Sequence, residues 1–159
     1  MKDNLVDYMD NHIVQLRGSG LMTLIRNADR RRTETPNGAM TTLATPTQGG
    51  TEGIAVWHVD MLPGRTGPLH AFDTEQVWTF LDGTATIDLD GREMEAAPGD
   101  TVVLPADSPR QMTAGGTGFT AVVAAHAGCL VYDPDQVVDD TKCEIAPQGD
   151  ERLVPPWAK

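Results

Sequence analysis

The sequence has few of the residues on which many specialised folds depend. Aromatic residues make up 5% of its 159 residues, and the only cysteines are Cys129 and Cys143. A disulfide-stapled fold needs several cysteines, and a cysteine metal site needs closer spacing and more partners. We therefore expect two reduced structural thiols.

Long hydrophobic runs are also missing. No run approaches the roughly 18 apolar residues that a membrane-spanning helix needs. The opening residues, MKDNLVDYMDNH, contain acidic side chains and no long apolar core, so they do not resemble a secretory signal. The sequence predicts a cytoplasmic protein with no membrane partner.

Positive charge is scarce. Lys and Arg number 12 against 23 Asp and Glu, which gives a net charge of -11. The first 52 residues contain six of each sign, so residues 53–159 carry the whole excess. Because an acidic surface repels phosphate backbones, we expect no nucleic-acid partner.

What is present is a succession of short segments with β-sheet periodicity. In IAVWHVDM, at 54–61, every second residue after Ile54 is apolar, and in QVWTFL the residues Gln76, Trp78 and Phe80 share one face. TATIDLDGREMEA reads as a hairpin, because Asp-Gly favours a type I′ turn. The further predicted strands are DTVVLPA, RQMTA, GFTAVVAAH and CLVY. This pattern predicts an all-β sandwich or barrel.

The two ends of the chain are less regular. We expect a short helix at 1–12, two short strands in IVQL and LMTLI, and a long polar connection from Arg30 to Gly53. The predicted division is an N-terminal arm with extra strands at 1–52, a barrel core at 53–132, and a tail at 133–159 that packs on the barrel. Trp157 suggests a docked anchor in that tail.

Two segments have a fixed spacing of glycines and polar residues. In the first, five residues follow Gly64 before His70-Ala71-Phe72, three more lead to Gln76, and six more lead to Gly83. The second is PGDTVVLPADSP and its continuation. It places Gly99, Pro105, Asp107, Arg110 and Ala114 at matching intervals.

Both segments resemble the two motifs of the cupin superfamily over roughly residues 54–126. The family pattern is Gly, five residues, His-x-His, three or four residues, Glu, six residues, Gly; then Gly, five residues, Pro-x-Gly, two residues, His, three residues, Asn. The resemblance implies a jelly-roll β-barrel, a small-molecule ligand, and most often a homodimer.

The family's four metal-ligand positions are degenerate in this chain. They are typically His, His, Glu and His, and here they are His70, Phe72, Gln76 and Arg110. Phe offers no lone pair, and Arg is a permanent cation. We therefore expect no cofactor. If a metal is present, we expect a single divalent transition metal held by an atypical set: His70, Gln76, Glu75 and His126.

The remaining pocket would be apolar and aromatic, as small-molecule sites usually are. Its predicted substrate-binding residues are Phe72, Gln76, Trp78, Met112 and Trp57. The aromatic rings either stack on a flat substrate or simply pack the core. Gln76 either orients a substrate oxygen or holds His70 in one tautomer.

His70 and Arg110 are the predicted catalytic pair. A buried guanidinium needs a partner, which is either an internal acid such as Glu75 or Asp107 or an acidic group of the ligand. His70 beside that cation would have a lowered pKa and stay neutral, ready to accept a proton.

Three functions fit this pattern. The first is a metal-independent acid/base enzyme of the cyclase, isomerase or lyase type. It would act on a carboxylate- or enolate-bearing substrate, with aromatic compounds and the intermediates of natural-product metabolism among the candidates. The second is a non-catalytic barrel that binds a small ligand, and the third is a metal-dependent, oxygenase-like cupin with an atypical ligand set.

Overall fold

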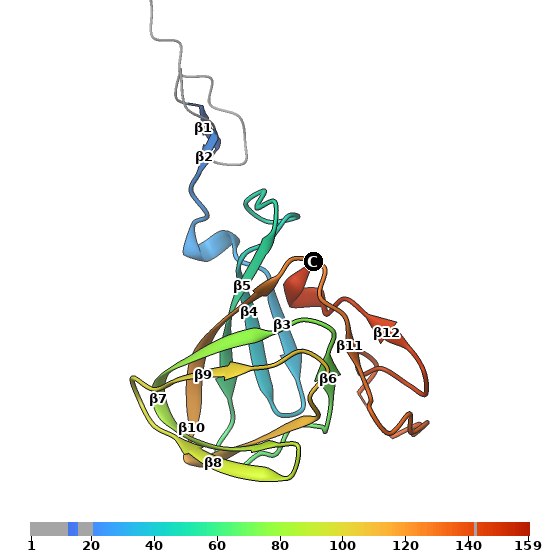
Figure 1. Cartoon of the computed structure of the whole chain (residues 1–159). Helices are drawn as coiled ribbons and strands as arrows, with labels where there is room; N and C mark the ends of the chain where they lie inside the picture. Colours follow the sequence, from blue (N-terminus) through green and yellow to red (C-terminus); the bar gives the residue numbers. More distant parts are fainter. Residues whose placement is uncertain (1–12, 16–20, 142) are drawn as a thin grey trace, which may run out of the picture.

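The computed structural model describes residues 13–15, 21–141 and 143–159, and nearly all of its regular structure is β-strand (Figure 1). Two short 3-10 helices, η1 and η2, complete it, and among the described residues no helix has the length and apolar character of a membrane span. The helix predicted at 1–12 lies outside the described residues.

The elements in chain order are β1 (Ile13–Gln15), β2 (Leu21–Thr23), η1 (Asn27–Asp29), β3 (Arg32–Thr35), β4 (Gly38–Ala44), β5 (Ile54–Met61), β6 (Ala71–Phe72), β7 (Gln76–Leu89), β8 (Arg92–Ala96), β9 (Thr101–Leu104), β10 (Arg110–His126), β11 (Val131–Tyr132), β12 (Arg152–Leu153) and η2 (Pro156–Ala158).

One large antiparallel sheet curls into the barrel (Figure 1). Its strand order is β3-β4-β5-β10-β7-β8, and β9 pairs with the first part of β7. A small sheet, β12-β11-β6, joins the C-terminal segment to the barrel, while β1 and β2 pair with each other. The predicted all-β jelly-roll class is confirmed.

The two longest strands correct part of the sequence interpretation. QVWTFL and the segment after it form the single strand β7, and RQMTA and GFTAVVAAH form the single strand β10. Glycines allow these strands to bend where they were predicted to end: Gly83 and Gly118 have φ values of 71° and 79°, and the β7–β10 register shifts between Ala114 and Phe119. Such bulges bend a strand without ending it.

The predicted hairpin at Asp90-Gly91 is confirmed. Both residues have positive φ, at 51° and 78°, and Leu89 pairs with Arg92 across the turn. Two consecutive residues with positive φ are the requirement of a type I′ turn.

The long polar connection predicted between residues 30 and 53 is wrong. Residues 32–44 form the β3–β4 hairpin, with Thr35 opposite Gly38 and Pro36-Asn37 in the turn. β4 then pairs with β5, where Met40 lies opposite Val59. The threonines of this region favour strands. The Pro36-Asn37 pair, which suggested a loop, forms the turn of a hairpin.

The C-terminal segment lies on the same part of the barrel. η2 contacts β3, β4 and β5, and the Thr42 hydroxyl donates a hydrogen bond to the Trp157 carbonyl at 3.0 Å. The Trp157 side chain packs against the hydrophobic core. It is therefore the anchor that its place in the sequence suggested.

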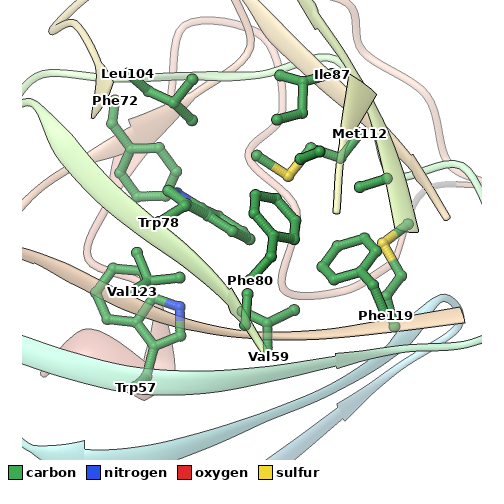
Figure 2. Close-up of a cluster of buried hydrophobic side chains, with 14 of the residues drawn as sticks. Trp57, Val59, Phe72, Trp78, Phe80, Ile87, Leu104, Met112, Phe119 and Val123 are labelled. Atoms are coloured by element: carbon green, nitrogen blue, oxygen red, sulfur yellow. The ribbon is translucent and has the colours of Figure 1, made fainter. Parts of the chain in front are cut away.

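Aromatic rings fill the barrel interior (Figure 2). The Phe80 ring stacks on Trp78 at 6.4 Å between centroids and meets Phe119 edge to face at 5.3 Å. Cys129 is buried in the same core, where burial raises the pKa of its thiol to about 11. Cys129 and Cys143 are both free thiols.

Gly83 gives a test of the bend. A Cβ added there would overlap the Gly118 carbonyl oxygen and lie 2.8 Å from Phe119 Cα, whereas a Cβ on Gly91 meets open space. Both glycines have positive φ, so Gly91→Ala is a matched control for backbone strain. We expect Gly83→Ala to lower the free energy of unfolding by about 3 kcal/mol and Gly91→Ala by about 1 kcal/mol. Chemical denaturation measures both, and equal losses would contradict the packed bend.

Candidate functional site

A cavity of about 410 Å³ adjoins the hydrophobic core. Five of the predicted site residues lie on its wall, and they come from β5, β7, β10, β6 and the residue before β6: Trp57, Trp78, Met112, Phe72 and His70. Figure 2 shows Trp57, Phe72 and Trp78 grouped at one side of the core. The wall is mostly apolar, as the walls of small-molecule sites usually are.

Three cavity-lining segments were missed by sequence reasoning. The β3–β4 turn with its flanks, residues 35–40, forms one part of the wall, residues 66–69 form a second, and Cys143 with residues 145–147 of the C-terminal segment form a third. Ile145 is the signal that could have revealed the C-terminal segment, because it is a large apolar residue in a stretch that is rich in acidic side chains.

His70 is held in one orientation by local hydrogen bonds. Its backbone pairs with that of Arg110, at 3.1 Å from His70 N to Arg110 O and 2.9 Å in the reverse direction. The ring atom Nδ1 lies 2.8 Å from the Pro68 carbonyl oxygen. Because a carbonyl can only accept, Nδ1 carries the proton and Nε2 keeps its lone pair.

The charge state of His70 follows from its surroundings. Burial lowers the pKa of the imidazole from 6.5 to about 4. The hydrogen bond to Pro68 opposes this shift, and the Arg110 cation adds to it. His70 is therefore neutral at pH 7, as predicted, although burial contributes more than Arg110.

Arg110 points into the protein and is fully buried. Its Nε donates to Ser108 O at 3.2 Å and its Nη2 donates to Pro105 O at 3.0 Å. Asp107, at the glycine position of the family motif, has φ of 58° and turns the chain between these two carbonyls. Burial lowers the pKa of Arg110 to about 10, so the side chain stays a cation at neutral pH.

Gln76 completes the binding of this cation. Its Oε1 accepts hydrogen bonds from Arg110 Nη1 at 3.2 Å and from Trp78 Nε1 at 3.0 Å. The guanidinium carbon lies 5.5 Å from the centre of the Phe72 ring. Gln76 and Arg110 are not among the described residues that line the cavity, although Gln76 binds the Trp78 indole and Arg110 lies beside the Phe72 ring, and both rings do line it.

An internal acid, one of the two alternatives for the partner of Arg110, is not in direct contact with it. The Asp107 carboxylate accepts a hydrogen bond from the Tyr132 hydroxyl at 2.8 Å, and it acts on Arg110 only through its charge. Glu75 is exposed. Carbonyl and amide oxygens therefore satisfy the guanidinium in place of a carboxylate.

The comparisons with known proteins agree with this architecture. The family described as "Cupin domain" matches residues 57–132. Residues 57–132 are a cupin domain. No curated protein sequence matches the chain.

Solved structures of other cupin-like proteins resemble the chain at low sequence identity. KdgF from a Halomonas species has a TM-score of 0.57 at 17% identity, over 65% of this chain and 92% of that chain. The polyketide cyclase RemF from Streptomyces resistomycificus has a TM-score of 0.59 at 18% identity, over 68% and 81%. Oxalate decarboxylase from Bacillus subtilis, an enzyme with Mn(II) centres, has a TM-score of 0.57 at 18% identity, over 62% of this chain but only 27% of its own. At these identities the likeness shows the fold.

The metal that the cupin family implies does not fit the residues present. Phe72 has no donor atom, Arg110 is a cation, and the Gln76 oxygen already accepts two hydrogen bonds. Glu75 and His126 are exposed and do not join His70 on the cavity wall. Within the described ranges, no three His, Cys, Asp or Glu side chains are grouped to hold a metal ion.

The lowered pKa of His70 predicts a specific pH dependence. The unfolded chain binds the His70 proton near pH 6.5 and the folded chain only near pH 4. Between these values the unfolded state holds more protons, so stability falls as pH falls. We expect His70→Gln to flatten the dependence of the free energy of unfolding on pH in this window, and an NMR titration to show one imidazole that stays neutral to about pH 4. Identical pH slopes in the two proteins would contradict the assignment.

Arg110 predicts a large loss of stability on truncation. Arg110→Met removes three hydrogen bonds of the buried guanidinium, to the Ser108 and Pro105 carbonyls and to Gln76 Oε1, so we expect the free energy of unfolding to fall by about 3 kcal/mol. Arg152→Met is the control, because Arg152 is exposed and stacks on the Tyr132 ring at 3.9 Å. It should cost less than about 1 kcal/mol. Denaturant titration compares them, and a loss at Arg110 no larger than at Arg152 would show that the buried contacts are weak.

Proposed function

We propose that this cupin binds a small, flat, mostly apolar molecule in its cavity and uses His70 to move a proton on it. The observation that carries the proposal is the state of His70: a neutral imidazole on the cavity wall, with Nδ1–H fixed to Pro68 and Nε2 left to accept. The surrounding rings of Trp57, Phe72 and Trp78 suit a planar ligand.

The reaction class that fits is proton abstraction next to a carbonyl group. His70 Nε2 takes the proton, the electrons of the broken C–H bond move into an enolate, and the imidazolium returns a proton to the same or another atom. Isomerisation, cyclisation and elimination can all begin with this step. General base catalysis contributes about 10²–10⁴-fold to such reactions.

Arg110 supports this step as a positioning residue. Its backbone pairs with that of His70, its charge favours the neutral imidazole, and its side chain holds the loop at 105–108. Direct contact between Arg110 and a ligand carboxylate has less support, because three of its N–H groups already bind protein oxygens. We therefore favour a ketone or phenol over a carboxylate as the ligand's polar group.

A non-catalytic binding barrel is the second candidate. The observation that favours it is the pKa of about 4, because a base so far below neutral pH has a small driving force for proton removal. In that case His70 is only a hydrogen-bond acceptor for the ligand. The metal-dependent alternative has no support from the donor set.

The homodimer implied by the family resemblance stays a prediction. Val77 and Val103 face each other across β7 and β9 and are exposed. An apolar outer face of this kind is where we expect a second copy to dock.

Deuterium exchange distinguishes the two candidates. The probe is 2-tetralone, a flat uncharged ketone, in D₂O with NMR detection of deuterium entering the carbon next to the carbonyl. We expect the wild-type protein to accelerate exchange and His70→Gln to lose about 100-fold or more of that acceleration. His126→Gln is the control, because His126 is exposed at the end of β10. Equal exchange with wild type and His70→Gln would support passive binding and overturn the enzyme proposal.

A further inference from the structure

Parts of the cavity wall lie outside the matched cupin domain, residues 57–132. Residues 35–40 come before that domain, and Cys143, residues 145–147 and Trp157 come after it. The family domain therefore supplies only part of the wall. The fit between cavity and ligand also depends on residues that the family pattern does not describe.

The chain has few aromatic residues, and most of them line the cavity. It contains three Trp, three Phe and two Tyr, and all three Trp and two of the Phe belong to the wall. Four of these five rings come from the cupin domain, and the fifth is that of Trp157. Because a Trp ring presents a large and rigid contact area, its place on the wall affects which ligands fit.

Hydrogen bonds to neighbouring segments fix the backbone around Trp157. The buried Thr42 hydroxyl donates to the Trp157 carbonyl at 3.0 Å, and Arg31 Nη2 donates to Lys159 O at 3.0 Å. Thr42 lies opposite the wall residue Trp57 in the β4–β5 register. The segment that carries Trp157, η2, is therefore docked on β3, β4 and β5, where Figure 1 shows the end of the chain.

The Trp157 side chain takes up space at this side of the cavity. It packs against the hydrophobic core, and Trp157 belongs to the wall together with Met40 of β4 and Trp57 of β5. Since protein interiors are closely packed, the size of one wall side chain limits the size of the ligand beside it. A smaller side chain at position 157 would extend the cavity toward these strands.

We propose that Trp157 is a specificity-determining residue that limits the size of the cavity ligand, and that Thr42 is a positioning residue for it. The inference rests on the proposed function for the kind of ligand, a flat ketone or phenol. It adds that the C-terminal segment selects compact ligands over those extended by a further ring.

Two phenols that differ by one fused ring test this role by binding alone. They are 2-naphthol and 9-phenanthrol, and the readout is the size preference, which is the Kd of 9-phenanthrol divided by the Kd of 2-naphthol. We would measure both Kd values by titration with wild type, Trp157→Ala, Trp157→Phe, Thr42→Val and Val154→Ala. Val154→Ala is the control, because Val154 lies in the same segment and packs against the same core but is not among the described residues that line the cavity.

The size preference should fall most where the ring is removed. We expect it to fall about 10-fold in Trp157→Ala and less in Trp157→Phe, because a shortened wall side chain admits the additional ring. Thr42→Val keeps the side-chain shape and loses only the hydroxyl that binds the Trp157 carbonyl, so we expect a fall of about 3-fold. Val154→Ala should keep the wild-type value. Unfolding curves verify that the variants are folded, and Trp157→Phe decides if Trp157→Ala is not.

The outcomes separate this inference from the proposed function. An unchanged size preference in the folded Trp157 variants would overturn the role of Trp157, whether or not deuterium exchange depends on His70. An equal fall in Val154→Ala would also overturn it, because any loosening of the segment would then widen the cavity. No change in Thr42→Val alone would overturn only the positioning role.

A fall that occurs in the Trp157 variants and not in Val154→Ala supports the inference even if deuterium exchange does not depend on His70. If neither phenol binds the wild-type protein, the cavity is not a site for such ligands, and both proposals fail.

Discussion

The site depends on one buried cation. Arg110 lies in the interior with no carboxylate in direct contact, and its charge is stabilised by the carbonyls of Pro105 and Ser108 and by the amide oxygen of Gln76. A buried charge is costly unless every such contact is made. The turn at 105–108 and the start of β7 are therefore fixed relative to one side chain, and the backbone of the same residue pairs with that of His70.

That cation also sets the chemistry of its surroundings. It occupies a metal-ligand position of the cupin motif, and it favours the neutral form of His70. Through Gln76 it fixes the indole of Trp78, which forms part of the cavity wall. The site therefore has a positive charge, as a metal-containing cupin site does. Unlike a metal ion, the guanidinium donates hydrogen bonds and is not coordinated by lone pairs.

The sequence predicted the fold because its signals are local. Alternating residues such as Gln76, Trp78 and Phe80 report burial directly, and the spacing of glycines and prolines reports the turns. The long bent strands were misread, because the sequence alone does not tell a glycine at a bulge, such as Gly83 or Gly118, from a glycine in a turn. The β3–β4 hairpin was missed because its Pro-Asn turn was read as part of a long loop.

The site was predicted only in part. The wall residues Trp57, Phe72, Trp78, Met112 and His70 follow from strand alternation and from the motif. The partners of Arg110 do not, because backbone carbonyls have no signature in a sequence and their direction depends on turn geometry. The sequence does not predict the contribution of residues 143–147 to the cavity either, because this contribution depends on the path of a long irregular segment.

The central claim is that Arg110 and Gln76 stand in place of the family's metal. Elemental analysis of protein purified without added metal or chelator, by inductively coupled plasma mass spectrometry, tests it most directly. The account predicts far less than one transition-metal ion per chain, with no change in Trp fluorescence when a chelator is added. A metal content near one ion per chain, removed together with a change in that fluorescence, would contradict it.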